Sequence, residues 1–511
     1  MLIKTYGCAV YGINATKVTV EVNISTGINF FLVGLPDSAV KESQQRIVAA
    51  LKNTGYKMPG NTITVNMAPA DIRKEGSAYD LTIAVGILAA SEQINSTEVS
   101  DYVIMGELSL DGELRPVRGV LPIAINAKEE GFKGIILPKQ NVAEAAVVEG
   151  LEVYGASSLN EIINFFNGKA DLVREMPNTD SVNDNIVPYE YDFCDVRGQE
   201  NIKRALEIAA AGGHNVILIG PPGAGKTMLS KRLPSILPAL NKEEALETTK
   251  IHSVAGKLGK QTGLVKLRPF RSPHHTISDV ALVGGGGNPQ PGEISLAHNG
   301  VLFLDELPEF KRTVLEVMRQ PLEDRVVTIS RAKGSVEYPA SFMLVASMNP
   351  CPCGFYNHPE KECVCAPGVV QKYLNKISGP LLDRIDLHVE VTPVPFSELS
   401  QAPAKEKSKD IRERVIKARE IQFRRYENRA GVYSNSQMKT KDLQVICHLD
   451  DACSQLLKTA MERLGLSARA YDRILKVART IADLDNSEKI NTSHIAEAIQ
   501  YRSLDRSGWA G

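Results

Sequence analysis

Residues 220–227 read GPPGAGKT, and this run constrains the fold more than any other feature of the chain. An apolar stretch at 216–219 precedes it, and a helical pattern at 228–237 follows it. A strand, a glycine-rich turn and a helix in that order form a phosphate-binding loop, because backbone N–H groups at the helix N-terminus point at the phosphates. The sequence therefore predicts a parallel α/β sheet that binds ATP. The alternative is a chance glycine-rich turn.

Each part of this loop has an expected contact with the nucleotide. Lys226 would reach the β- and γ-phosphates, and the Thr227 hydroxyl would bind Mg²⁺. The predicted nucleotide-binding residues of the loop are Gly220, Pro221, Pro222, Gly223, Ala224, Gly225, Lys226 and Thr227.

Two later apolar stretches end in polar residues that suit ATP hydrolysis. Residues 301–306 read VLFLDE, so Asp305 and Glu306 follow a strand, at the edge where open α/β sheets bind ligands. Asp305 would hold Mg²⁺, mostly through water, and Glu306 would polarise the attacking water. Asn349 ends a third strand, where it would hold that water and the γ-phosphate. The alternatives are a strand that ends in solvated carboxylates and, for Asn349, a turn before Pro350.

The N-terminal third of the chain, residues 1–168, has the pattern of a mixed α+β domain. Valines and an isoleucine alternate with polar residues at 18–24, as in a half-buried strand. Asp37 or Ser38 is a plausible N-cap for the helix that follows. Strands are expected at 18–24, 62–67 and 134–138, helices at 36–53 and 80–90, and a hairpin at 104–117 around Asp111-Gly112.

The rest of the chain separates into an alternating region and a helical region. Residues 169–190 are acidic and polar, and 396–409 contain Pro, Ser and Lys, so both are predicted linkers. Between them, 191–395 alternate apolar strands with helices, which predicts βαβ units. Residues 410–511 form a predicted helical lid domain. The predicted fold class is therefore multidomain α/β, with sheet strands at 216–219, 301–305, 343–348 and 387–391.

Composition limits the partners and the location that the chain can have. The net charge is −1, so any contact with nucleic acid must use a local basic surface. The first ten residues hold one lysine and no long apolar run, which argues against a signal peptide. No window reaches about eighteen uninterrupted apolar residues, so no membrane span is expected. We therefore expect a cytoplasmic protein with no membrane partner.

Four of the eight cysteines lie close together, at Cys351, Cys353, Cys363 and Cys365. Four thiolates on one loop suit tetrahedral Zn²⁺, and His358 between the pairs could replace one of them. The sequence therefore predicts a structural zinc site, with four surface thiols as the alternative. The remaining cysteines, Cys8, Cys194, Cys447 and Cys453, are scattered.

Longer strings of residues carry a family resemblance over essentially the whole chain. They are VRGQ at 196–199, GPPGAGKT, FRSPHHTISDVALVGGG from 270, VLFLDE, ASMNPCPCG from 346 and SGPLLDRIDLHVEV from 378. Together they resemble the AAA+ superfamily, its magnesium-chelatase-like branch, and within that branch the bacterial ComM/YifB family.

The resemblance implies roles for charged residues beyond the loop. Arg384 matches the family's arginine finger, which reaches the γ-phosphate held by a neighbouring subunit and so implies a ring, a homo-hexamer. Arg469 matches the sensor-2 arginine of the lid and would also contact the nucleotide, with Arg473 one turn further on. The alternative for Arg384 is a salt bridge with Asp383 or Asp386. The predicted catalytic residues are Lys226, Glu306, Asn349 and Arg384.

The N-terminal domain resembles the proteolytic domain of Lon, through KEGSAYDL from residue 74 and a second segment from residue 119. The position of the Lon serine falls on Ala78, and that of the lysine falls within 121–123, which hold no lysine. Without this dyad no nucleophile is activated, so a fold without peptidase chemistry is predicted. Ser77 as a shifted nucleophile is the alternative.

Two segments are expected to contact a polymer in the channel of a ring. They are 270–298 and the predicted hairpin 326–339, where Arg331 and Lys333 would contact DNA phosphates. An ordinary hairpin with a solvated tip is the alternative, and a basic helix at 410–429 is a further candidate. The resemblance thus implies a DNA helicase or branch-migration motor in recombination and natural transformation. The competing hypotheses are a metal-insertion motor, a protease and a nucleotide-gated scaffold or protein remodelling factor.

Overall fold

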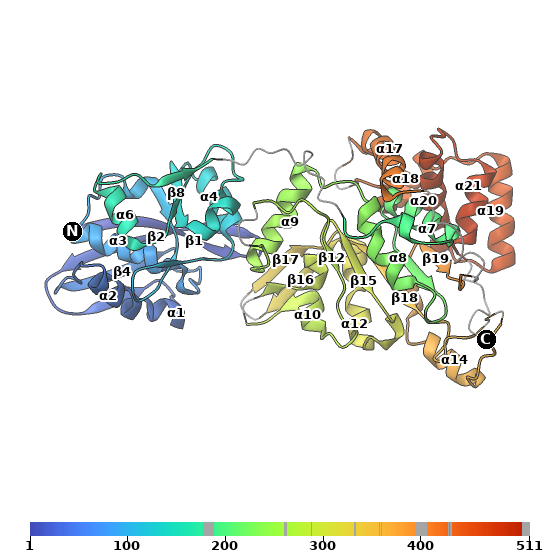
Figure 1. Cartoon of the computed structure of the whole chain (residues 1–511), viewed down its shortest axis with the longest axis horizontal. Helices are drawn as coiled ribbons and strands as arrows, with labels where there is room; N and C mark the ends of the chain where they lie inside the picture. The colour runs from blue at the N-terminus through green and yellow to red at the C-terminus, as the bar shows by residue number, and fades with distance from the viewer. Residues whose placement is uncertain are drawn as a thin grey trace. The chain divides into compact units, whose positions relative to one another are not determined.

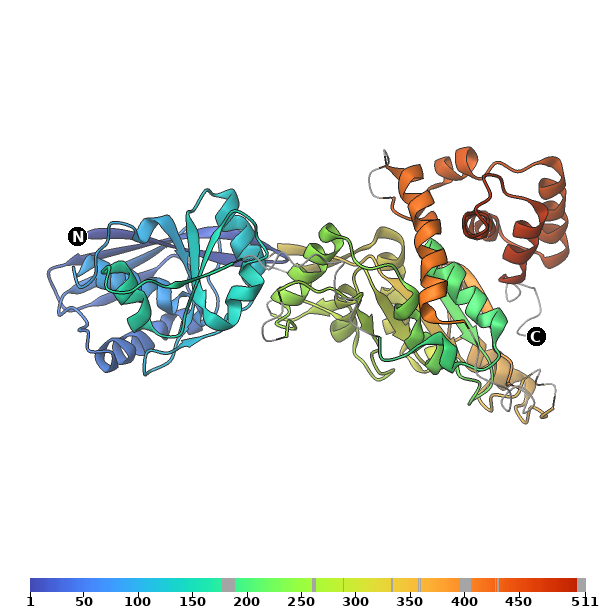
Figure 2. The same cartoon turned by 45° about the horizontal axis from the view of Figure 1, so that its top comes forward.

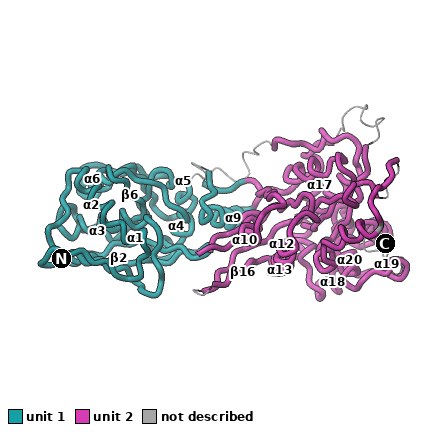
Figure 3. Tube along the Cα trace, turned by 90° about the horizontal axis from the view of Figure 1, so that it is seen from below, with its two compact units in different colours: residues 1–184, 241–266 teal, residues 185–240, 267–511 magenta. Residues whose placement is uncertain are grey.

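The structure, a computed structural model, describes residues 1–176, 189–259, 263–287, 289–331, 334–356, 358, 360–394, 406–427, 429 and 432–502. The chain divides into two compact units (Figure 3). Unit 1 comprises residues 1–184 and 241–266, and unit 2 comprises residues 185–240 and 267–511.

Unit 1 is built on an eight-stranded mixed sheet with the order β10-β9-β8-β5-β1-β2-β4-β3. Four of these strands, β1, β2, β4 and β8, are labelled in Figure 1. Alternation places Val18, Val20 and Val22 on the buried face of β2, as the sequence predicts. A short antiparallel pair, β6 Glu107–Leu108 and β7 Leu114–Arg115, confirms the predicted hairpin. The sheet strands are β1 Leu2–Tyr11, β2 Asn14–Ser25, β3 Phe30–Val33, β4 Thr62–Ala68, β5 Tyr102–Ile104, β8 Gly134–Pro138, β9 Glu152–Ala156 and β10 Val173–Glu175.

The helices of unit 1 bury apolar faces against this sheet. The helix predicted at 36–53 is divided at Glu42 into α1 and α2, and Asp37 caps α1 by accepting from the Val40 N–H at 2.8 Å. The predicted helix at 80–90 is α3, and all of its residues are buried. The helices of residues 1–176 are α1 Ser38–Lys41, α2 Ser43–Asn53, α3 Asp80–Ala90, α4 Val120–Glu129, α5 Val142–Ala145 and α6 Leu159–Phe166.

One helix of unit 1, α9 (Lys242–Val254), comes from the middle of the chain, between the GPPGAGKT loop and Asp305. The Gly119 N–H, at the start of α4, donates to the Ser253 carbonyl at 3.3 Å. The Ser253 hydroxyl donates to the Glu144 carboxylate, which also accepts from the Leu121 N–H at 2.8 Å. Burial raises the pKa of Glu144, although these hydrogen bonds oppose the shift. Unit 1 is therefore assembled from two separate stretches of sequence.

Unit 2 contains the parallel sheet that the sequence predicts. Its order is β12-β15-β18-β11-β19, and every neighbouring pair is parallel. The carboxyl ends of the strands therefore meet at one edge, where Gly220, Asp305 and Asn349 follow their strands. The strands are β11 Val216–Ile219, β12 Phe270–Arg271, β15 Val301–Leu304, β18 Met343–Met348 and β19 Leu387–Glu390.

The C-terminal helices of unit 2 share one hydrophobic core with this sheet. Helix α17 lies along α7 (Figure 2), and Gln422 Nε2 donates to the Ala211 carbonyl at 3.0 Å. Among the described residues, the α-helices of unit 2 are α7 Glu200–Gly212, α8 Lys226–Arg232, α10 Asp279–Val283, α11 Glu293–Leu296, α12 Arg312–Val317, α13 Arg319–Asp324, α14 Pro367–Leu374, α15 Gly379–Leu382, α17 Ser408–Tyr426, α18 Thr440–Ile446, α19 Asp451–Leu464, α20 Ala468–Leu484 and α21 Thr492–Gln500. Across the described ranges, no helix has the length and apolar character needed to span a bilayer.

Two small antiparallel strand pairs of unit 2 lie in the segments expected to contact a polymer. Strands β16 (Val326–Arg331) and β17 (Gly334–Pro339) form the predicted hairpin. Strands β13 (Gly284–Gly285) and β14 (Gln290–Pro291) form the other pair. The Tyr338 hydroxyl donates to the Pro289 carbonyl at 2.7 Å, which joins the two segments.

Two boundaries differ from the sequence prediction. Residues 241–266, predicted to be part of the 191–395 domain, cluster with unit 1. Strand β10 lies inside the predicted linker 169–190 and pairs antiparallel with β9. This edge strand is short and its Val173 is exposed, so the sequence carries no burial pattern that would reveal it.

Candidate functional site

The GPPGAGKT loop follows β11 and leads into α8 with the backbone that a phosphate cradle needs. A Cβ at Gly220 would lie 2.2 Å from the Val391 carbonyl oxygen, so only glycine fits there. Gly223 and Gly225 have φ values of +79° and +87°, and Gly225 is the N-cap of α8. These turns leave the N-terminus of α8 at the carboxyl edge of the sheet, ready for an anion.

Lys226 lies inside this loop rather than on its surface. Its ammonium donates to the Gly220 and Pro221 carbonyls at 2.6 and 2.9 Å and to Asn349 Oδ1 at 3.0 Å. Burial lowers the pKa of Lys226, and the nearby charges of Asp305 and Glu306 oppose that shift. The structure thus brings the predicted Lys226 and Asn349 side chains into direct contact.

Asp305 and Thr227 are also in contact, as a shared magnesium ion would require. The Thr227 hydroxyl donates to Asp305 Oδ2 at 2.7 Å. The Ser347 hydroxyl, which is not among the residues predicted from sequence, donates to Asp305 Oδ1. Hydroxyl and carboxylate oxygens are ligands that Mg²⁺ accepts, with water and phosphate completing its shell. These residues fit an ATP–Mg²⁺ site in chemistry and in position.

Glu306 adopts a left-handed backbone conformation, with φ at +55°. Its carboxylate is half exposed and lies 3.5 Å from Nδ1 of His275. His275 follows β12, the strand next to β15 in the sheet, so both residues emerge at the same edge. This contact depends on the order of the strands in the sheet. Nothing local in the sequence links the two residues, so the sequence alone does not predict it.

Arg384 and Arg469 lie in a second site, a charged pocket of about 140 Å³. Arg384 forms an ion pair with Glu323 at 2.5 Å, which replaces the partners Asp383 and Asp386 considered from sequence. Arg469 pairs with Asp383 at 3.0 Å. Among the described residues, the pocket is lined by Glu323, Asp383, Arg384, Arg469, Asp472, Arg473 and Lys476.

A buried carboxylate fixes the back of this pocket. Asp386 accepts from Arg473 at 2.8 Å and from the Asn215 N–H at 3.1 Å, and it lies 3.3 Å from His214 Nδ1. Burial would raise the pKa of Asp386, but Arg473 and His214 hold it well below its usual range. Burial also lowers the pKa of Lys476 to about 8, and the Arg473 charge adds to that shift. The pocket is thus rich in cationic side chains attached to a fixed frame.

The four clustered cysteines converge, as the sequence predicts. One thiol sulfur from each of Cys351, Cys353, Cys363 and Cys365 lies within 4.8 Å of the others. His358 is not part of this group: its Nδ1 accepts from the Glu360 and Lys361 N–H groups at 3.0 and 3.1 Å. The expectation that His358 replaces a thiolate is therefore not supported by its position.

The positions compared with the Lon dyad do not assemble one. Ala78 packs against the core of unit 1, and Leu121 and Ile123 are buried in α4. The Ser77 hydroxyl donates to the Glu107 carboxylate, which lies on β6. Among these residues there is no lysine, the group that activates the serine in the Lon dyad.

Arg331 and Lys333 are the two residues predicted to contact DNA. Arg331 is exposed at the end of β16, paired in register with Gly334. Lys333 lies outside the described residues.

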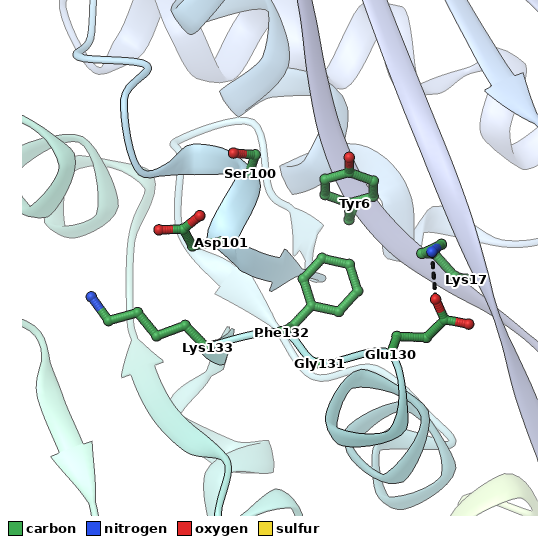
Figure 4. Close-up of a pocket in the computed structure, with 8 residues that line it drawn as sticks. All are labelled: Tyr6, Lys17, Ser100, Asp101, Glu130, Gly131, Phe132 and Lys133. Carbon is green, nitrogen blue, oxygen red and sulfur yellow. Dashed lines mark hydrogen bonds and ion pairs between the residues drawn. The ribbon is translucent and has the colours of Figure 1, made fainter.

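Unit 1 also has an open hollow of about 420 Å³ (Figure 4). Lys17 and Glu130 form an ion pair at one side of it. Its lining residues are Tyr6, Lys17, Ser100, Asp101, Glu130, Gly131, Phe132 and Lys133. None of the site residues predicted from sequence is in this set.

Comparisons with known proteins agree with this arrangement. A model for the magnesium chelatase subunit ChlI matches residues 192–399, a second model for that subunit matches 20–141, and a model of its C-terminal part matches 405–502. Lon protease 2 of Bacillus subtilis is 30% identical over 129 residues, which cover 25% of this chain and 23% of that protein.

Two relatives match over nearly their whole length. The competence protein ComM of Haemophilus influenzae is 46% identical over 512 aligned residues, covering 99% of this chain and 98% of that protein. The uncharacterized protein YifB of Escherichia coli is 46% identical over 500 residues, covering 98% and 96%. Together with the parallel-sheet core and its nucleotide loop, these matches suggest a competence-related ATPase. The chain belongs to the ComM/YifB family of magnesium-chelatase-like AAA+ proteins.

Proposed function

We propose that this chain is an ATP-driven motor that acts on DNA in the cytoplasm. The observation that carries the proposal is the contact set at one sheet edge: Lys226 with Asn349, and Thr227 with Asp305. In that geometry Lys226 binds the β- and γ-phosphates, and Thr227 and Asp305 hold Mg²⁺. Glu306 lies beside them, and its carboxylate polarises the water that attacks the γ-phosphate.

The second part of the proposal is that the active form is a ring, a homo-hexamer. Arg384 and Arg469 line a pocket with no residue of the GPPGAGKT loop among its described lining. In a ring, this pocket of one copy faces the nucleotide of the next copy. Its arginines then neutralise the charge that develops on the phosphates in the transition state. The ion pairs with Glu323 and Asp383 hold both arginines until the neighbour supplies a stronger anion.

The third part is that the polymer in the channel is branched or single-stranded DNA. The β16–β17 hairpin presents Arg331 and is joined to the β13–β14 segment through Tyr338 and Pro289. Arg331 contacts phosphates, as the sequence also predicts for Lys333, and such contacts suit a motor that moves along DNA without reading its sequence. The relative named a competence protein supports a role in recombination during natural transformation.

Unit 1 is proposed to keep the Lon-like fold without peptidase chemistry. Purified protein should not cleave an unfolded protein or a fluorogenic peptide in the presence of ATP. A cleavage activity that vanishes in Ser77→Ala would contradict this part of the proposal.

The deciding experiment measures ATP hydrolysis with and without single-stranded DNA or a four-way junction, followed by strand exchange on that junction. We expect stimulation by DNA that falls steeply as salt rises, because phosphate contacts release counterions. ATP turnover that no DNA stimulates would instead favour a chelatase-type motor for metal insertion or a nucleotide-gated protein remodelling factor.

A further inference from the structure

The four-cysteine loop lies between two elements of the nucleotide site. Cys351 comes two residues after Asn349, whose amide contacts Lys226 at 3.0 Å. Cys365 comes two residues before α14, which carries Tyr373. Tyr373 is hydrogen-bonded to the Asn349 backbone, and burial raises the pKa of its hydroxyl. The loop is therefore linked to Asn349 on both sides: directly along the chain at Cys351, and through Tyr373 of α14 beyond Cys365.

The loop also packs against the phosphate-binding loop itself. A Cβ added to Gly354 would lie 2.4 Å from Cδ of Pro222. Gly354 has φ at +84°, a conformation that glycine adopts without strain. The position therefore admits a backbone but no side chain, and it sets how closely the cysteine loop approaches GPPGAGKT.

The sulfur geometry suits one tetrahedral metal ion. The Cys351 sulfur lies 3.3 Å from that of Cys353 and 3.7 Å from that of Cys363, and the latter two are 3.6 Å apart. Four thiolates at about 2.3 Å from Zn²⁺ stand slightly further apart than this, so a small adjustment closes the site. Cys351 is buried, and its sulfur accepts from the Tyr356 N–H at 3.3 Å. That bond orients the sulfur toward the cluster.

We propose that Cys351, Cys353, Cys363 and Cys365 bind one Zn²⁺ that holds Asn349 and Pro222 in the geometry needed for ATP turnover. The ion replaces the four thiol protons, which pass to solvent. It closes the 351–365 loop and so limits the freedom of the chain on both sides of Asn349. The zinc is thus a structural part of the nucleotide site, although it touches neither ATP nor Mg²⁺.

The metal is tested first, without reference to activity. Elemental analysis of the full-length protein, purified without chelators, should give about one zinc per chain. The Cys363→Ser/Cys365→Ser variant should lose it, and Cys194→Ser, a cysteine outside the cluster, should keep it. Cobalt added to chelator-treated protein should give the visible bands of tetrahedral thiolate coordination. A wild-type protein without zinc and without these bands would disprove the site.

The link to the nucleotide is tested with the cysteines intact. Gly354→Ala should keep its zinc but bind a fluorescent ATP analogue more weakly and turn over ATP more slowly, by roughly tenfold or more, because Pro222 is displaced. Gly368→Ala is the matched control, since a Cβ there meets nothing within 4 Å. The nucleotide-affinity and kcat parts of this test rest on the proposed function, but the zinc content does not. If Gly354→Ala and zinc-depleted protein bind and hydrolyse ATP like the wild type, the metal is not coupled to the nucleotide.

Discussion

Glu306 combines a strained backbone with a carboxylate at the nucleotide edge. A non-glycine residue with φ at +55° costs about 1–3 kcal/mol, and such strain gathers at functional sites. In this conformation a carboxylate oxygen of Glu306 lies 3.5 Å from Nδ1 of His275. The residue is therefore positioned by its backbone, and its chemistry can be tested by a change that keeps its size.

Glu306→Gln should bind ATP with unchanged affinity and lose turnover by roughly a hundredfold or more, because an amide cannot accept a proton from the attacking water. The measurement is the steady-state ATPase rate together with the Kd of a fluorescent ATP analogue. Glu309→Gln is the control: Glu309 is exposed nearby and pairs with Lys376 at 3.3 Å, so its loss should leave both values unchanged. Equal turnover in Glu306→Gln and wild type would remove Glu306 from the mechanism.

At the scale of secondary structure, the sequence predicts the elements whose side chains are buried, because burial leaves an apolar pattern in the sequence. The limits of β11, α3 and β8 match their predictions because each is a short, mostly apolar run between polar residues, glycine or proline. Strand β10 and the packing of α9 on unit 1 were not predicted. An exposed edge strand has no pattern, and a helix sequence does not state which distant surface it covers.

The candidate nucleotide site also contains features that the sequence predicts and features that it does not. The motifs around Lys226, Thr227 and Asp305 predict roles for these residues, because each motif is a short continuous run of sequence. The contacts of His275 with Glu306 and of Arg384 with Glu323 depend on strand order and helix packing. Such long-range pairings leave no mark in a single sequence.

The β16–β17 hairpin carries a prediction about DNA. Arg331→Ala should weaken the salt dependence of DNA-stimulated ATPase by about one charge, because one phosphate contact is lost. The basal ATPase rate should not change, since the hairpin lies outside the contacts of Lys226 and Asp305. Lys458→Ala, an exposed lysine on α19, serves as the control. An unchanged salt slope in Arg331→Ala would place the DNA elsewhere.

For the molecule as a whole, the ring proposal predicts that two inactive variants rescue each other. Lys226→Ala lacks phosphate binding and Arg384→Ala lacks the finger, which is worth roughly a thousandfold in rate. When the two are mixed equally before assembly, roughly a quarter of the subunit junctions join an intact loop to an intact finger. The ATPase activity of the mixture should therefore recover to roughly a quarter of the wild-type rate.

A site completed within one copy gives the opposite result. Each variant then carries its defect in every site, and the mixture stays inactive at all ratios. Wild-type protein diluted with either variant provides the reference curve for subunit exchange.

The two-segment construction of unit 1 predicts how the chain tolerates truncation. Removing residues 1–176 takes away the surface that covers Leu246 and that bonds Ser253 of α9. The remaining chain should aggregate in size-exclusion chromatography, because this apolar face is left exposed. A chain that also replaces 241–266 by a short Gly/Ser connection should stay dispersed. Equal behaviour of the two truncations would mean that α9 does not depend on residues 1–176.

The position of α9 also bears on how such a protein could arise and change. Suppose that recombination replaces the coding region for residues 1–176 with that of a relative. The incoming segment then lacks its own α9 and must pack against the α9 of the recipient, which was selected to fit a different segment. Descendants therefore inherit both stretches together or lose the fit between them. Residues 1–176 and 241–266 should therefore show the same ancestry, even though 64 codons separate residue 176 from residue 241.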